Sequence, residues 1–264
     1  MRIAMGISYE GSPFEGWQSQ SSGRTVQDRI ESALKRVAGV PLRIVGAGRT
    51  DAGVHAAGQV AHFDCDVERP DSAWVRGTNS YLPAEIAVQW ALRVDSEFHA
   101  RFSAQARSYR YVLYNHPVRP ALASRHVGWV HSPLDVGAMR SAIEMLVGTH
   151  DFSSFRSSEC QAVSPIRTVE SASVEAAGPY VVLDITANAF LHHMVRNVVG
   201  SLVYVGKGKF APEWMSELLL AKDRGKAAPT LSPAGLYLRT VRYASRWNLP
   251  QFPGAVDGLV KDLM

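Results

Sequence analysis

The chain has 264 residues, of which 46% are hydrophobic and 20% charged, and its formal net charge is +4. These values exclude a disordered or fibrous protein and allow one large domain or two small ones. No stretch approaches the roughly 20 uninterrupted apolar residues of a membrane span, and no signal peptide is recognisable. Cys65 and Cys160 lie far apart and match no metal-ligand spacing. We therefore expect a cytoplasmic protein with free thiols.

In the first half of the chain, alternating apolar residues predict strands, and an apolar period of 3.6 residues predicts a helix. That helix has Thr25 as its N-cap and ends at Gly39. The predicted elements are a strand at 2–10, a helix at 25–39, a strand at 59–64, a short helix near 70–82 and a strand at 86–95.

The second half also combines predicted strands and helices. It is followed by a turn-rich tail (251–264) with a short amphipathic end and no assigned function. Strands mixed with helices, without regular βαβ spacing, favour an α+β fold with largely antiparallel sheet. We expect two lobes, 1–104 and 105–264, around a central cleft. The predicted elements of the second half are strands at 107–115, 167–176 and 180–188, and helices at 135–150, at 190–205 and from Pro212.

Charge is distributed unevenly between the two halves. Residues 1–104 carry 11 Lys and Arg against 12 Asp and Glu, whereas residues 105–264 carry 17 against 12. The surplus in the second half indicates either a solvated basic surface or a polyanionic partner held there, in a basic cleft.

The segment 46–64, GAGRTDAGVHAAGQVAHFD, places Arg49 and Asp51 two residues apart among four glycines. In an extended chain these two side chains point to the same side. Glycines permit unusual φ values and the close approach of another backbone. The pattern fits a loop that grips a ligand, or a turn held by a surface salt bridge worth about 0–1 kcal/mol.

Other segments also combine basic and aromatic residues. Arg196 lies on the polar side of the predicted helix 190–205, where it points at water or holds a carboxylate or phosphate. The strand 107–115 interleaves Tyr with Arg, as in core packing or in a stacking surface for unpaired bases. GKGKF and KDRGK (206–210 and 222–226) are small basic clusters, either solvated charge or a rail for a nucleic-acid backbone.

A metal site is not expected, although several histidines and Asp64 could be combined into one. No pair has the H-x-x-x-H spacing of a zinc hydrolase, and adjacent histidines on a helix point about 100° apart. No Walker loop, G-x-G-x-x-G after a strand or G-x-S-x-G elbow occurs, so no nucleotide cofactor or serine chemistry is expected. The residues considered are His55, His62, Asp64, His192 and His193.

Taken together, these segments resemble the TruA-type tRNA pseudouridine synthases. The resemblance rests on GRTDAGVHA and HHMVRN in the right order, and it extends through FEGWQSQ, TVQDRIESAL, FHARFSAQARSYRYVLYN, DFSSFR and AGLYL. It covers nearly the whole chain up to about Asn248. It implies the pseudouridine synthase fold, and a cofactor-free homodimer that isomerises uridine at positions 38, 39 and 40 in the anticodon arm of tRNA.

The resemblance also implies roles for four residues. Asp51 is the catalytic nucleophile, Tyr109 stacks on the target base, and Arg196 forms an ion pair with Asp51. A second role for Tyr109, relay of the proton that leaves C5, is a separate hypothesis. Arg49 helps to flip the base and hold it out of its stack. Three reactions of Asp51 stay open at this point: attack at C1′, attack at C6, or removal of a proton from the sugar. The roles of Trp17, Gln18 and His55 stay open as well.

Two other functions remain as alternatives. A non-catalytic RNA-binding protein would use the same basic second lobe but would tolerate the loss of Asp51. A metal-dependent phosphodiesterase built on the histidines would lose its activity in chelator.

Overall fold

Residues 1–250 are described by the computed structural model of the chain, and the predicted amphipathic tail 251–264 lies outside them. The described residues form two units. One comprises Met1–Gln105 together with 237–250, and the other comprises Ala106–Leu236. The lobes predicted from the sequence, 1–104 and 105–264, do not include this return of the chain to the first unit.

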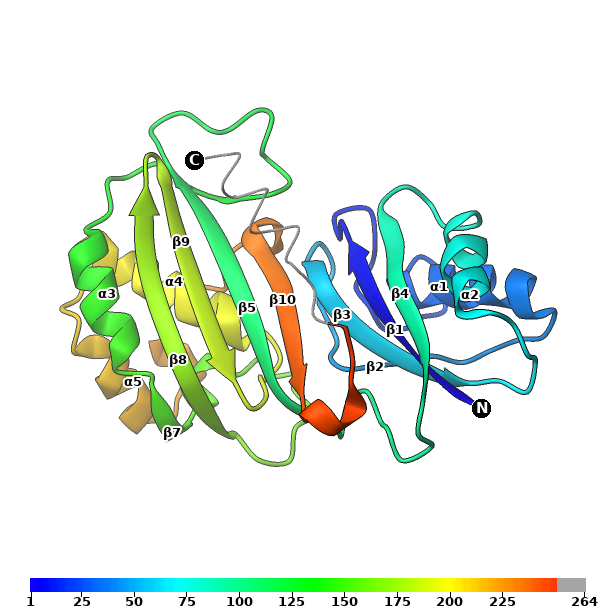
Figure 1. The fold of residues 1–264 in the computed structure, drawn as a ribbon. Coiled ribbons are helices and arrows are strands. Elements are labelled where there is room, and N and C mark those ends of the chain that lie inside the picture. The colour runs from blue at the N-terminus through cyan, green and yellow to red at the C-terminus, as the bar shows by residue number, and fades with distance from the viewer. Residues whose placement is uncertain (251–264) are drawn as a thin grey trace. The chain divides into compact units, whose positions relative to one another are not determined.

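The first unit contains an antiparallel sheet with one parallel strand added (Figure 1). Its strands are β1 (Arg2–Tyr9), β2 (Val45–Gly46), β3 (His55–Asp64), β4 (Ile86–Val94) and β10 (Leu236–Tyr243). Antiparallel pairs join β1 to β3, β1 to β4 and β2 to β3. Strand β10 runs parallel to β3, with Tyr237 opposite His55. A strand from late in the chain therefore lies beside the start of β3.

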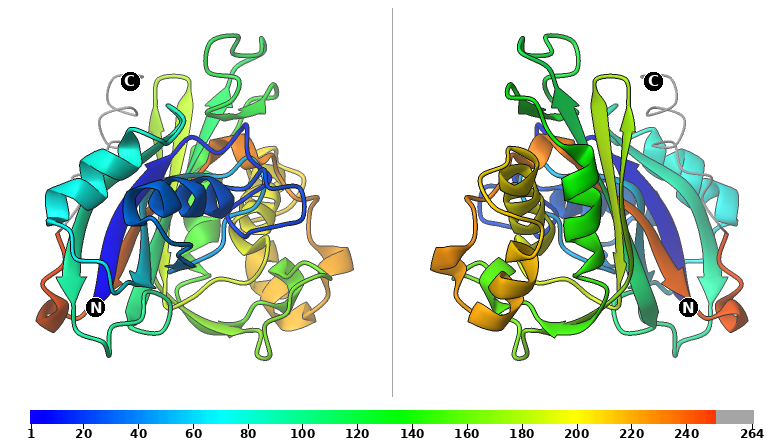
Figure 2. Two further views of the ribbon diagram at one scale, coloured as in Figure 1. Left: turned by 90° about the vertical axis from the view of Figure 1, so that its right-hand side faces the viewer. Right: turned by 90° about the vertical axis from the view of Figure 1, so that its left-hand side faces the viewer.

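Two helices, α1 (Val26–Ala38) and α2 (Asp71–Asn79), cover one face of this sheet (Figures 1 and 2). Thr25 and Asp28 form a capping box at the start of α1, and Gly39 ends the helix with a φ of 78°. The predicted start and end of this helix are thus confirmed. Ile30 and Leu34 on its apolar face are fully buried.

The second unit contains five further strands, most of them antiparallel (Figure 1). Its strands are β5 (Ala104–Asn115), β6 (Gly128–Val130), β7 (Gly148–Asp151), β8 (Ile166–Ala177) and β9 (Tyr180–Ala187). Antiparallel pairs join β5 to β9, β9 to β8 and β8 to β7, and β6 runs parallel to β5. The predicted α+β class with mostly antiparallel sheet is confirmed.

Three helices cover one face of the strands of the second unit (Figure 2). They are α3 (Val136–Glu144), α4 (Met194–Gly206) and α5 (Trp214–Ala221). Short 3₁₀ turns, η1 (Ser153–Phe155) and η2 (Arg224–Lys226), lie in the loops around them. Helix α4 is almost wholly buried, with Val198, Val199 and Leu202 fully covered. Within residues 1–250, no helix is long and apolar enough to cross a membrane.

Two predicted helices have wrong bounds. The helix expected over 135–150 ends at Glu144, because the chain then reverses through Gly148, with a φ of 114°, to form β7. The helix expected from 190 begins only at Met194, because His193 takes a left-handed φ of 63°. Strand β10 was not among the predicted elements.

A buried histidine, His62, lies near the end of β3. Its Nδ1 accepts a hydrogen bond from the Ala100 backbone amide at 3.1 Å, and its ring meets the His99 ring edge-on at 4.7 Å. Burial, followed by the nearby His99 and Arg2, lowers the pKa of His62 to about 4. Between a pH of about 4 and 6.5, the folded protein therefore keeps this ring neutral, whereas an unfolded chain would protonate it.

We predict that His62 makes the first unit sensitive to acid. Because the pKa of His62 is lower in the folded state, its contribution is constant above pH 6.5 and is lost progressively as the pH falls towards 4. Between these limits, wild type should lose about 2–3 kcal/mol more unfolding free energy than His62→Asn. Asn keeps an acceptor for Ala100 but does not titrate. Equal pH dependence of the two proteins in urea unfolding would contradict this.

Candidate active site

The loop between β2 and β3 carries Arg49 and Asp51, and Thr50 between them is its anchor. The Trp17 amide donates to the Thr50 carbonyl at 3.0 Å, and the hydroxyls of Tyr9 and Thr50 lie 2.7 Å apart. Thr50 is buried, whereas Arg49 is exposed and Asp51 is half-buried. Anchoring the middle residue in the core therefore leaves the guanidinium and the carboxylate on the more open side.

A turn follows Asp51 and leads directly into β3. The Val54 amide donates to the Asp51 carbonyl at 3.1 Å, and Gly53 inside this turn has a φ of 78°. On the other side, the Gln59 side chain donates to the Gly48 carbonyl at 2.7 Å. The backbone on both sides of Asp51 is thus held by hydrogen bonds within the first unit.

The glycines of this segment have different roles. A Cβ at Gly46 would lie 2.7 Å from the Trp17 ring, and one at Gly58 would lie 2.4 Å from the Arg239 carbonyl of β10. These two glycines are required by packing inside the protein. A Cβ at Gly48 would have no atom within 4 Å. The interpretation that the glycines leave room for a ligand therefore fits Gly48 but not Gly46 or Gly58.

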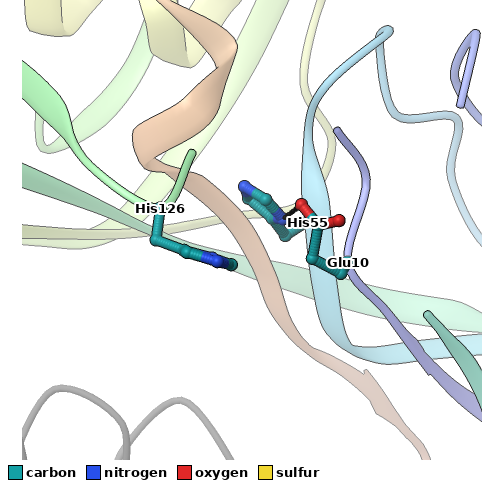
Figure 3. A group of neighbouring side chains, drawn as sticks. All are labelled: Glu10, His55 and His126. Atoms are coloured by element: carbon teal, nitrogen blue, oxygen red, sulfur yellow. Dashed lines mark ion pairs between the residues drawn. The ribbon is translucent and has the colours of Figure 1, made fainter. Parts of the chain in front are cut away.

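His55, the first residue of β3, holds the end of the loop. Its Nδ1 accepts from the Gly11 amide at 3.0 Å, and its ring stacks on Tyr237 at 4.7 Å. Glu10 Oε1 lies 3.4 Å from the same nitrogen, the contact drawn dashed in Figure 3. Because a nitrogen that accepts the Gly11 N–H carries no proton, this contact joins a carboxylate to a neutral ring. Burial, with the charge of Glu10, raises the pKa of Tyr237.

Histidines 55 and 62 were the candidates for a metal site in the first half of the chain. In both, Nδ1 accepts a backbone amide, from Gly11 and Ala100 respectively. Both rings are buried, with 2% and 4% of their surface exposed. These contacts are those of histidines that support the fold.

Tyr109 lies on β5 in the second unit. It is buried, and its ring meets Phe190 edge-on with centroids 4.9 Å apart. Tyr111, on the same face, is wholly buried and donates from its hydroxyl to the Ser232 carbonyl at 2.7 Å. Tyr111 is therefore a core residue, and of these two tyrosines Tyr109 lies nearer the surface.

The neighbouring Arg110 does not present its charge to a ligand. Its guanidinium forms a bidentate pair with Asp184 on β9, with distances of 2.9 and 2.7 Å. Only 12% of its side chain is exposed. The interpretation of 107–115 as a surface of alternating Tyr and Arg therefore fails at Arg110.

Arg196 lies in the first turns of α4 and is half-buried. Its Nε donates to the Leu231 carbonyl at 2.8 Å, and the Leu231 amide donates back to the Arg196 carbonyl at 3.3 Å. The segment around Leu231 thereby fixes the plane of the guanidinium. Asp51 belongs to the first unit and Arg196 to the second, and their ion pair stays a prediction.

The other residues expected on the polar side of α4 are placed differently. His192 and His193 precede the helix, with ring centroids 4.0 Å apart and planes tilted by 35°. The two rings therefore do not diverge as expected for adjacent histidines on a helix, because neither lies within α4. Asn197 is fully buried, and a Cβ at Gly200 would lie 2.3 Å from the Pro229 carbonyl.

The sequence did not reveal the residues that support the candidate site. Thr50, Tyr9 and Gln59 form ordinary strand and loop patterns, and Leu231 acts only through its backbone. No local signal could have identified them, because each supports the loop or Arg196 through a partner that is distant in the chain.

A family model and individual relatives of the chain point to the same kind of protein. A family model described as tRNA pseudouridine synthase matches residues 5–103 and 142–244. The chain is 55% identical over 262 residues to tRNA pseudouridine synthase A of Dechloromonas aromatica, covering 99% of this chain and 100% of that protein. It is 56% identical over 250 residues to the protein of the same name from Aromatoleum aromaticum, covering 95% of each.

We predict that Gly16 is essential to the anchoring of Thr50. Gly16 has a φ of 86°, and a Cβ there would lie 2.7 Å from the Thr50 carbonyl. Gly23, with a φ of 66° and nothing within 4 Å, is the matched control. In urea unfolding, Gly23→Ala should cost about 1 kcal/mol and Gly16→Ala about 2–4 kcal/mol. Equal costs would show that the close contact has no energetic weight.

Proposed function

The chain belongs to the tRNA pseudouridine synthase family, and from that premise we propose that it isomerises uridine at positions 38, 39 and 40 in the anticodon arm of tRNA. The observation that carries this proposal is the anchored Thr50, with Arg49 and Asp51 on either side of it. The two matched segments of the family model contain Asp51 and Arg196, and Tyr109 lies between them.

The reaction requires no redox partner and no energy source. The N1–C1′ bond breaks, the uracil turns, and C5 bonds to C1′, while the C5 proton leaves and N1 gains a proton. Bonds are broken and made within one nucleotide, so the balance closes without a cofactor. We therefore propose a synthase that uses neither cofactor nor metal.

Asp51 is the catalytic residue in this proposal. As the nucleophile it attacks C1′ or C6, or alternatively it removes a proton from the sugar, and each of these steps needs an ionised carboxylate. The hydrogen bonds around Thr50 and the Asp51–Val54 turn support a fixed position for that carboxylate. Fixing the carboxylate before the substrate binds lowers the entropic cost of reaching the reacting carbon.

Arg196 is proposed to form an ion pair with Asp51 and to keep it ionised, because a nearby positive charge favours the carboxylate. Its contact with Leu231 supports this role, since a guanidinium held by one nitrogen has fewer orientations to lose on pairing.

Arg49 is proposed to hold the target nucleotide out of its stack. Extruding a base from a stem costs a few kcal/mol. Arg49 is exposed, and its neighbour Gly48 leaves open space beside it. A long cationic side chain at such a position can occupy the space left by the flipped base and contact the adjacent phosphates.

Tyr109 is proposed to stack on the flipped uracil and to relay the proton that leaves C5. Its ring is held edge-on by Phe190, which supports a fixed stacking surface. We further propose that the enzyme is a cytoplasmic homodimer.

We predict that Asp51→Asn abolishes catalysis without abolishing tRNA binding. Release of tritium from tRNA labelled at uridine C5, measured in EDTA, should fall by about 10² to 10⁴ or more. Wild type should keep full activity in EDTA, and Asp66→Asn, which changes an exposed carboxylate of the same unit, should match wild type. Unchanged release by Asp51→Asn would favour a different catalytic residue. No release by wild type on unmodified tRNA would leave the RNA-binding alternative, and loss of release in EDTA would favour the metal-dependent one.

We predict that Tyr109→Phe keeps stacking but removes the proton relay. The tRNA Kd should stay within about twofold of wild type while tritium release slows by about tenfold to a hundredfold. Tyr114→Phe, which removes a hydroxyl on the same strand, is the control and should leave both unchanged. Full turnover by Tyr109→Phe would refute the relay.

A further inference from the structure

The second unit contains a basic cavity of about 520 Å³ whose lining includes neither Tyr109 nor Arg196. It lies where the segment after η1, the residue before α4 and the segment around η2 meet. Its lining residues, which define the basic cavity below, are Ser153, Arg156, Ser157, Ser158, His193, Lys222, Asp223, Arg224 and Thr230.

The cations of the basic cavity are held mainly by neutral groups. Arg156 donates to the carbonyls of Cys160 and Ala162, at 2.6 and 2.8 Å. Arg224 donates to the Ala227 carbonyl at 3.2 Å. In the part of the chain that the structure describes, neither guanidinium forms an ion pair with a carboxylate. Their positive charge is thus not cancelled inside the protein.

The acidic residues near the basic cavity are largely engaged elsewhere. Asp223 Oδ1 accepts from the Gly225 amide at 2.8 Å, within its own turn. Asp151 accepts from the Ser153 amide and hydroxyl, and it lies 3.6 Å from Lys222, a long contact for an ion pair. The Lys222 side chain is 60% exposed. The balance of charge in the cavity is therefore positive.

A buried amide fixes the position of Arg224. Asn197 on α4 has no exposed surface, and its Oδ1 accepts from Arg224 at 3.1 Å and from Thr230 at 2.6 Å. Its Nδ2 donates to the Phe155 carbonyl at 2.8 Å. One carboxamide thus joins α4, η1 and the segment around η2. Burial lowers the pKa of Arg224, a cost that an anionic ligand would offset.

The chemistry of the lining favours an anion over a base. Three cationic side chains stand beside the hydroxyls of Ser157 and Ser158, and all of these groups can donate to phosphate oxygens. The hydroxyls of Ser153 and Thr230 already donate to Asp151 and Asn197. Apart from the imidazole of His193, no aromatic ring lines the cavity, so it lacks the stacking surface that unpaired bases need.

We propose that the basic cavity binds a phosphodiester of the tRNA backbone, with Arg156, Lys222 and Arg224 as its contacts and Asn197 as the residue that positions Arg224. The identity of the RNA rests on the proposed function. The site gives a place to part of the KDRGK cluster, since Lys222 and Arg224 line the cavity whereas Lys226 does not.

That difference supplies a matched control. Lys222→Gln and Arg156→Gln remove a charge from the cavity, and Lys226→Gln removes one from an exposed residue of the same cluster. With unmodified tRNA as the probe, the two cavity variants should raise Kd about tenfold more than Lys226→Gln. They should also reduce the slope of log K against log salt by about one. If Arg156→Gln fails to fold, the exposed Lys222 carries the test.

Ethylation interference identifies the ligand. In wild type, ethylating the phosphate that the cavity binds should weaken binding, and in Lys222→Gln that one position should cease to matter. Cavity variants that match Lys226→Gln in Kd, salt slope and interference pattern would overturn the proposal.

The same proteins separate this site from the proposed reaction. At saturating tRNA, the cavity variants should release C5 tritium at the wild-type rate, with KM raised and kcat retained. Loss of binding in the variants with no release by wild type would refute the reaction but support the cavity. Release by all proteins with unchanged binding would refute the cavity alone.

Discussion

The hydrogen bonds that hold Thr50 are the constraint on which the candidate site of the first unit depends. The Trp17 amide and the Tyr9 hydroxyl draw one loop residue into the core, and its two neighbours are consequently turned outward. Gly16 makes this approach possible because any side chain at its position would meet the Thr50 carbonyl. A flexible loop would carry the same charged residues, but without a fixed spacing between them.

The second unit uses a different device for the same purpose. Its polar residues are positioned by neutral acceptors: buried Asn197 on α4 holds Arg224, and the backbone of Leu231 holds Arg196. These acceptors fix the orientation of each guanidinium and bring no negative charge of their own. For a protein whose family acts on tRNA, this preserves the positive charge that a polyanion requires.

The bounds of an element were predictable where the residues that determine them lie within that element. The capping residues of α1 lie within the helix, so both its ends were predictable. The start of α4 was not predictable. The apolar period extends N-terminal to the helix through Leu191 and Phe190, although His193 already lies outside the helix. Strand β10 was missed because its place beside β3 is set by pairing across most of the chain.

The candidate residues show the same division. Asp51 and Arg49 stand in a motif specific enough to be found from sequence alone, and so does Arg196. The pairing of Arg110 with Asp184 was invisible, because cross-strand partners cannot be read from one strand. The burial of Asn197 was equally hidden, since a polar residue on a helix ordinarily faces water.

The return of β10 to the first unit has a consequence for biosynthesis. The second unit is continuous from Ala106 to Leu236, whereas the first needs residues from both ends of the described chain. On the ribosome, the second unit is therefore complete in sequence before the first has received its parallel strand. The early-made half of the protein must wait for the late-made strand, and the last unit to mature is the one that carries Asp51.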